Sequence, residues 1–142
     1  MRKILGTVAA VVFVGATLGA VYPGQQPVIP ADQASKPNPV KPTAEGIERA
    51  KKVFAVDCAL CHGEDGSGKS DLASSMNLKL KDFRDPDTLK KRTDGEIYYI
   101  ILNGAGTMPA EGNRAKPDDL WNLVVYLRGF SDPSVLPADK KK

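Results

Sequence analysis

The sequence predicts an all-α domain built from about three to five short helices. Three observations support this fold class. Apolar residues recur at helical spacing in three segments between residues 43 and 130, and each of these segments begins or ends at a recognisable capping residue. No segment there alternates apolar and polar residues, as a half-buried strand would. The flanking segments differ in composition and are not expected to belong to the domain.

Residues 1–22 have the composition of an export segment. Arg2 and Lys3 precede nineteen uncharged residues, 4–22. This run is long for a signal peptide and just long enough to cross a bilayer, so a cleaved signal peptide and a retained N-terminal membrane anchor are both open. In either case we expect the rest of the chain on the periplasmic side, soluble or anchored to the cytoplasmic membrane by residues 4–22.

Two further segments are predicted to lie outside the domain. Residues 23–42 contain six prolines and few apolar side chains, which predicts an extended linker. Residues 131–142 end in three lysines and are expected to form a basic tail. The net charge of +3 arises within residues 1–42, because basic and acidic side chains are equal in number over 43–142. This balance gives no indication of nucleic-acid binding.

The first helix is expected to begin at Thr43, a plausible N-cap after a proline, and to run to the cysteine motif. Ile47, Ala50 and Phe54 lie on one face of it at helical spacing. This face predicts a core contact along the whole helix.

Two more helices follow in the second half of the domain. One begins at Thr93, where Glu96 three residues later completes a capping box, and ends at Gly104. The other begins at Pro117, a residue favoured in a first helical turn, and ends at Gly129. Both helices carry apolar residues in their interior and are expected to pack on the first.

The sequence "CALCH" holds Cys58, Cys61 and His62, which are the only cysteines and the only histidine of the chain. This spacing fits a redox disulfide, half of a zinc site or a c-type haem attachment site. A zinc site needs four ligands, and a thioredoxin-like dithiol belongs beside a βαβ pattern that the sequence lacks. Haem attachment uses all three residues. The motif therefore favours one covalently attached haem c, with thioether bonds to both cysteines and iron bound by His62.

A haem also accounts for the size of the domain. About 90 residues bury little apolar surface, and a covalently held macrocycle supplies a core for short helices to surround. The stretch 63–87 carries at most one predicted short helix, near 72–76. A loop of this length is unusual in a compact domain unless it surrounds a bound group, and the haem would be that group.

The sixth iron ligand is expected to be Met108. It lies in "NGAGTMP", where Gly104 and Gly106 permit a close backbone approach and Pro109 stiffens the turn. An isolated methionine usually fills a gap in the core, but this setting is typical of a placed ligand. Met76 is the alternative.

With "CALCH", "DGSGK" and "GTMP" in this order, residues 43–130 resemble the class I c-type cytochromes, in particular the small bacterial monohaem members. The resemblance implies the class I cytochrome c fold, in which the first and last helices cross. It implies that Ala50 and Phe54 form the contact on the first helix, with Leu123 and Tyr126 as partners on the last.

A closed, six-coordinate iron transfers single electrons. We therefore expect an electron carrier that relays electrons between redox proteins, a membrane complex among them, and we expect neither an enzyme nor a small-molecule substrate. The first alternative is a fixed haem c subunit of a larger respiratory or photosynthetic complex. The second is a gas-binding or peroxidatic haem domain with an open sixth site, which the position of the haem motif disfavours.

Five other residues have expected roles near the haem edge. Lys79, Lys81 and Lys116 are candidates for the rim of a docking surface, although ordinary solvation explains each of them as well. Tyr98 and Trp121 are candidates for hydrogen bonds to the haem propionates, with ordinary packing as the other interpretation.

Overall fold

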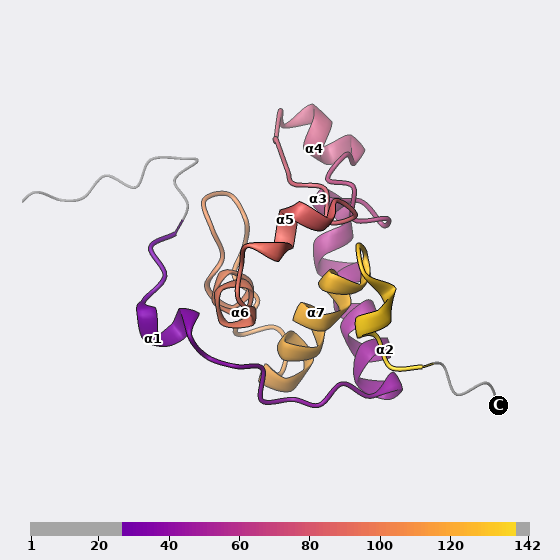
Figure 1. The fold of residues 1–142 in the computed structure, drawn as a ribbon. Coiled ribbons are helices and arrows are strands. Elements are labelled where there is room, and N and C mark those ends of the chain that lie inside the picture. Colours follow the sequence, from indigo (N-terminus) through magenta and orange to yellow (C-terminus); the bar gives the residue numbers. More distant parts are fainter. Residues whose placement is uncertain (1–26, 139–142) are drawn as a thin grey trace, which may run out of the picture.

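The computed structural model describes residues 27–138, and this part of the chain is helical (Figure 1). The elements in chain order are α1 (Ala31–Ala34), α2 (Ala44–Val53), the π-helical turn η1 (Phe54–Cys58), α3 (Ala59–His62), α4 (Asp71–Ser75), α5 (Pro86–Lys90), α6 (Asp94–Asn103), α7 (Pro117–Gly129) and the 3-10 turn η2 (Pro133–Val135). No strand occurs between residues 27 and 138, where an isolated bridge joins Ala105 and Met108. The all-α class predicted from the sequence is confirmed.

The predicted export segment, 1–22, lies outside the described residues. Among the helices of residues 27–138, none combines the length and the apolar character that a membrane span requires.

The predicted first helix is observed as α2, η1 and α3 in direct succession. Thr43 caps it, because its hydroxyl accepts a hydrogen bond of 3.1 Å from the backbone N–H of Gly46. The π-helical turn interrupts the α-helix just before Cys58, and such turns are frequent at functional sites. Gly63 ends the succession at a φ of +79°, so the cysteine motif occupies its last turns.

α2 and α7 pack across each other and form the most extensive contact between elements (Figure 1). Ala50 is fully buried, and the rings of Phe54 and Tyr126 lie 5.5 Å apart in an edge-to-face arrangement. Gly46 is an additional contact point, because a Cβ there would lie 2.8 Å from Oδ1 of Asn122. Phe54 and Tyr126 are therefore in contact as the resemblance implied, and Ala50 and Leu123 are both buried in the core.

α6 and α7 are joined at one end by a single arginine. Arg128 donates hydrogen bonds to the Asp94 carboxylate at 2.7 Å and to the backbone carbonyls of Leu89 and Arg92 at 3.2 and 2.8 Å. The predicted capping box at the start of α6 is present, with Thr93 and Glu96 each accepting from the other's backbone N–H.

Residues 30–40, which we call the strap, form part of the segment predicted to be a linker. They contain α1 and pass beside α6 and then α7 (Figure 1). Thr93 donates to the carbonyl of Ala34 at 2.5 Å, and Asn38 donates to the carbonyl of Trp121 at 3.2 Å. The strap, although part of the predicted linker, thus packs against the domain. Where the linker ends and the domain begins stays a prediction.

Gly95 makes this close approach possible. A Cβ at this buried position in α6 would lie 2.9 Å from the carbonyl oxygens of Ala34 and Lys36 and would overlap that of Gln33. The backbone of the strap therefore rests directly on the backbone of α6. Composition alone does not reveal such a contact, because it depends on main-chain atoms and one glycine.

Gly95→Ala is expected to detach the strap and to lower the free energy of unfolding by about 1–3 kcal/mol, because the added methyl group has no room. Equilibrium unfolding in denaturant measures the loss, and limited proteolysis within 30–40 reports the detachment. In a chain that lacks residues 27–37 the same substitution should no longer lower the free energy of unfolding, because the carbonyl groups that crowd the added methyl group are absent. An equal loss with and without the strap would contradict this account.

Candidate haem site

The three residues of the motif lie on one stretch of helix. Cys58 ends the π-helical turn, and Cys61 and His62 follow in α3. Residues three and four positions apart share a helix face, so both thiols and the imidazole are presented on the same side. Both cysteines are free and half-buried.

His62 carries an unsatisfied polar atom. Its Nδ1 is buried and has no hydrogen-bond partner among the described residues. Burial lowers the pKa of His62, which favours the neutral imidazole that binds metals. A buried orphan nitrogen on the residue next to two free thiols fits a haem iron ligand.

The side chain of Phe83 stacks on the His62 ring, with 4.9 Å between centroids and 20° between planes. The backbone N–H of Phe83 donates to the carbonyl of Gly66 at 2.8 Å, and that of Gly68 donates to the carbonyl of His62 at 2.7 Å. Gly66 and Gly68 both have a positive φ, which explains the glycines of "DGSGK". The sequence argument did not find Phe83, because nothing in its local pattern marks it as a neighbour of the histidine.

The Cys58 thiol is held in its protonated form. Burial first, and then the carboxylates of Glu111 and Asp57, raise its pKa to about 12, while Arg114 acts in the opposite direction. A redox-active or nucleophilic cysteine needs a thiolate near neutral pH. This environment therefore disfavours the dithiol interpretation and agrees with a cysteine whose sulfur ends in a thioether.

The loop of Met108 folds back on the end of α6. Ala105 and Met108 exchange two backbone hydrogen bonds, of 3.1 and 2.9 Å, around a tight turn in which Gly106 has a φ of +59°. Gly104 has a φ of +75°, and a Cβ there would overlap the carbonyl of Met108. Met108 is half-buried and packs on the hydrophobic core that Cys58 also touches. Met76, at the end of α4, is 52% exposed.

The residues expected at the haem edge have clear positions. Tyr98 and Trp121 stack face to face, with 3.9 Å between ring centroids and 8° between planes, and Trp121 is buried. Lys79, Lys81 and Lys116 are exposed.

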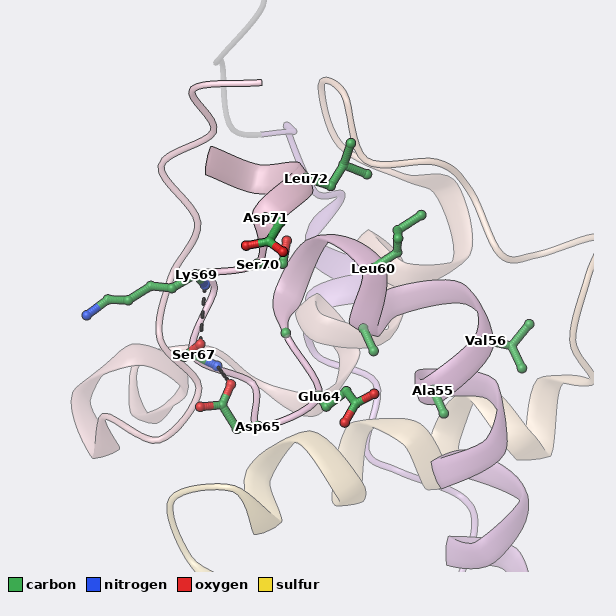
Figure 2. Close-up of a pocket in the computed structure, with 12 residues that line it drawn as sticks. Ala55, Val56, Leu60, Glu64, Asp65, Ser67, Lys69, Ser70, Asp71 and Leu72 are labelled. Carbon is green, nitrogen blue, oxygen red and sulfur yellow. Dashed lines mark hydrogen bonds between the residues drawn. The ribbon is translucent and has the colours of Figure 1, made fainter. Parts of the chain in front are cut away.

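An open hollow lies beside α3, between the π-helical turn and α4 (Figure 2). Val56, Leu60 and Leu72 line it together with the charged side chains of Glu64 and Lys69. Neither cysteine, nor His62, nor Met108 is among its lining residues, so this hollow is distinct from the candidate haem site. Its apolar side chains are exposed, with 77% of Val56 and 67% of Leu60 accessible to solvent.

Comparison with known sequences finds c-type cytochromes. The family described as cytochrome C oxidase, cbb3-type, subunit III matches residues 45–127. The cbb3-type cytochrome c oxidase subunit FixP of Azorhizobium caulinodans is 36% identical over 81 residues, which cover 56% of this chain and 26% of FixP. Cytochrome c6 of Cladophora glomerata is 33% identical over 89 residues, covering 59% of this chain and 88% of the relative. The chain thus spans about a quarter of FixP and most of the cytochrome c6.

Solved structures give the same result. The KustC0563 c-type cytochrome superposes with a TM-score of 0.52 at 28% identity, covering 58% of this chain and 98% of that one. A chain of the Kuenenia stuttgartiensis reducing HAO-like protein complex Kustc0457/Kustc0458 superposes with a TM-score of 0.56 at 25% identity, covering 70% and 47%. The class I cytochrome c fold implied by the sequence resemblance is confirmed.

These matches and the buried, unpaired Nδ1 of His62 beside two free cysteines lead to one assignment. Since the family match covers more than half of the chain, the protein belongs to the c-type cytochrome family described as cytochrome C oxidase, cbb3-type, subunit III, and its cofactor is covalently bound haem c.

Proposed function

We propose that the protein is a one-electron carrier with a single haem c, attached through Cys58 and Cys61 and bound at the iron by His62 and Met108. The observation that carries this proposal is the placement of two free thiols and an imidazole whose buried Nδ1 has no hydrogen-bond partner on one stretch of helix. When bound, the haem supplies an iron that stores one electron, and a histidine with a methionine completes its coordination.

The residues around the motif hold the two proposed iron ligands in place. Phe83 stacks on the imidazole and restricts its rotation, and the turn closed by Ala105 and Met108 restricts the thioether. The crossing of α2 and α7 fixes the helix that carries the cysteines. Ligands that cannot move between oxidation states favour electron transfer over substrate chemistry, which requires an open iron position.

Electrons are proposed to leave through the haem edge near Cys58 and Cys61. Both cysteines are half-buried, so this edge is accessible to a small, transient interface with a redox protein. Lys79, Lys81 and Lys116 are exposed and remain candidates for its rim.

Potentiometric titration followed by absorption spectroscopy tests this function. We expect a single one-electron transition, and we expect the spectrum of the reduced protein at neutral pH to be unchanged by carbon monoxide, because Met108 occupies the sixth position. A shift of the Soret band on adding carbon monoxide would instead favour a gas-binding or peroxidatic haem domain with an open site.

The second candidate is a fixed haem c subunit of a larger respiratory complex. It is favoured by the relatives named as FixP subunits of a cbb3-type oxidase, one of them 36% identical over the aligned residues. The two candidates share the same haem chemistry and differ in whether the partner is permanent.

Intact mass of the haem-containing protein from membrane and soluble fractions separates the two candidates. A full-length chain with one haem in the membrane fraction, co-purifying with other proteins, would support the subunit. A shortened chain with one haem in the soluble periplasmic fraction would support the mobile carrier and a cleaved signal peptide.

A further inference from the structure

Glu111 is a buried carboxylate three residues after Met108. Its side chain is 3% exposed. One oxygen, Oε1, accepts a hydrogen bond of 3.2 Å from Arg114, and the other, Oε2, is buried and has no partner among the described residues. Glutamate is rarely buried without full pairing, so a half-paired carboxylate in the interior calls for a functional explanation.

The backbone fixes where this carboxylate lies. The N–H of Glu111 donates to the carbonyl of Ile101 at 2.9 Å, and the N–H of Gly112 donates to that of Leu102 at 3.0 Å. A Cβ at Gly112 would lie 2.8 Å from the same Leu102 oxygen, so the loop is pressed against α6. These two backbone hydrogen bonds therefore hold Glu111 in its buried position.

Arg114 connects Glu111 to the cysteine motif. Its guanidinium pairs with Asp57, the residue before Cys58, as well as with Glu111. The side chain of Arg114 is 52% exposed, whereas those of Asp57 and Glu111 are 15% and 3% exposed. Solvent therefore screens the single positive charge more than the two negative charges.

The group as a whole presents negative charge to Cys58. With both carboxylates ionised, one guanidinium leaves a formal charge of −1. The pKa of the Cys58 thiol reflects this negative charge. Glu111 and Asp57 each raise that pKa, and Arg114 lowers it by less. Burial and Asp57 also raise the pKa of Glu111 itself, while Arg114 lowers it. Asp57 and Arg114 are thus the charged groups that act on this carboxylate, and Cys58 is a titratable group on which the carboxylate acts.

We propose that Glu111 sets the reduction potential of the haem, its buried charge beside Cys58 favouring the ferric over the ferrous state. The inference rests on the proposed function, in which Cys58 forms a thioether to the haem. Reduction adds one electron, supplied by a reduced redox protein, to the iron, and no bond is made or broken. The added negative charge is repelled by the carboxylate, and the low dielectric of the interior strengthens this repulsion.

Glu111→Gln tests the proposal, because glutamine has nearly the same shape and can still accept a hydrogen bond from Arg114. We expect the ferrous-to-ferric ratio at a fixed applied potential to rise about tenfold, which is 59 mV for one electron. Glu48→Gln, at an exposed position of α2, is the matched control and should change this ratio by less than about twofold.

Arg114→Gln gives an opposite prediction that a merely structural role would not produce. Loss of the positive charge leaves two carboxylates unopposed, so the reduction potential should fall. Opposite shifts in the two variants support the proposal. Shifts of the same sign, or a Glu111→Gln shift no larger than that of Glu48→Gln, would overturn it.

The test of Glu111 can be distinguished from a test of the proposed function. If the wild-type protein carried haem but lacked the methionine-to-iron band, the assignment of Met108 would be wrong, and the comparison of Glu111→Gln with Arg114→Gln would still decide the role of Glu111. The electrostatic argument depends on the position of Cys58 and not on the identity of the sixth ligand.

Discussion

Met108→Ala is expected to abolish the sulfur-to-iron charge-transfer absorption of the ferric protein and to lower the reduction potential by on the order of 100 mV or more. The thioether favours ferrous iron. Its loss therefore lowers the ferrous-to-ferric ratio at a fixed applied potential, by about tenfold for each 59 mV by which the reduction potential falls. Absorption near the red end of the spectrum and a redox titration measure the two effects. Haem should remain covalently attached, because both cysteines are unchanged.

Met76→Ala is the matched control for this experiment. Met76 follows α4 and is 52% exposed, whereas Met108 is half-buried on the core. We expect Met76→Ala to leave both the band and the potential nearly intact. The opposite pattern, with the band lost only in Met76→Ala, would transfer the ligand to Met76 and contradict the proposed role of the glycine-rich loop.

Gly104→Ala tests the same loop without removing the sulfur. A Cβ at this residue would lie 3.0 Å from the amide nitrogen of Ala110 and would overlap the carbonyl of Met108, and the φ of +75° is strained for alanine. We therefore expect a weakened charge-transfer band although the thioether is present. Ala110→Gly, at an exposed position in the same loop, should leave the band unchanged.

Local signals in the sequence predict the main helices well. The capping box at Thr93 and the proline at position 117 mark α6 and α7, and both helices begin where these residues indicate. Thr43 marks the start of α2 in the same way. These signals succeed because each depends on hydrogen bonds between residues a few positions apart, which the local sequence specifies.

The features that the sequence does not reveal depend on distant residues. The strap lies on α6 because Gly95 has no side chain, and a glycine inside a helix predicts no particular partner. Phe83 stacks on His62 although twenty residues, including the short helix α4, separate them in the chain. Glu111 looks like any surface glutamate in sequence, and only its position between Ile101 and Arg114 buries it.

Local motifs indicate the chemistry of the site more clearly than its surroundings. The spacing within "CALCH" fixes the three residues on one helix face, so a haem attachment site could be inferred directly. The pairing of Arg114 with both Asp57 and Glu111 could not, because it joins the loop after α6 to the π-helical turn η1, more than fifty residues earlier in the chain. The motif alone therefore does not predict which residues adjust the reduction potential.

Replacing Cys58 and Cys61 together with alanine is expected to remove the covalent haem and, with it, the cooperative thermal unfolding of the domain. A domain of this size has a free energy of unfolding of about 5–15 kcal/mol, and the macrocycle is expected to supply much of the apolar contact behind it. Intact mass under denaturing conditions measures attachment, and circular dichroism during heating measures folding.

Cys61→Ala alone is the informative control, because Cys58 remains to form one thioether. We expect haem to stay covalently attached in this variant, with a shifted α-band and a lowered melting temperature. A double variant that unfolds cooperatively without haem would show that the helices of residues 27–138 complete their own core. The buried, unpartnered Nδ1 of His62 argues against that result, because an apoprotein with this fold would retain an unsatisfied polar group in its interior.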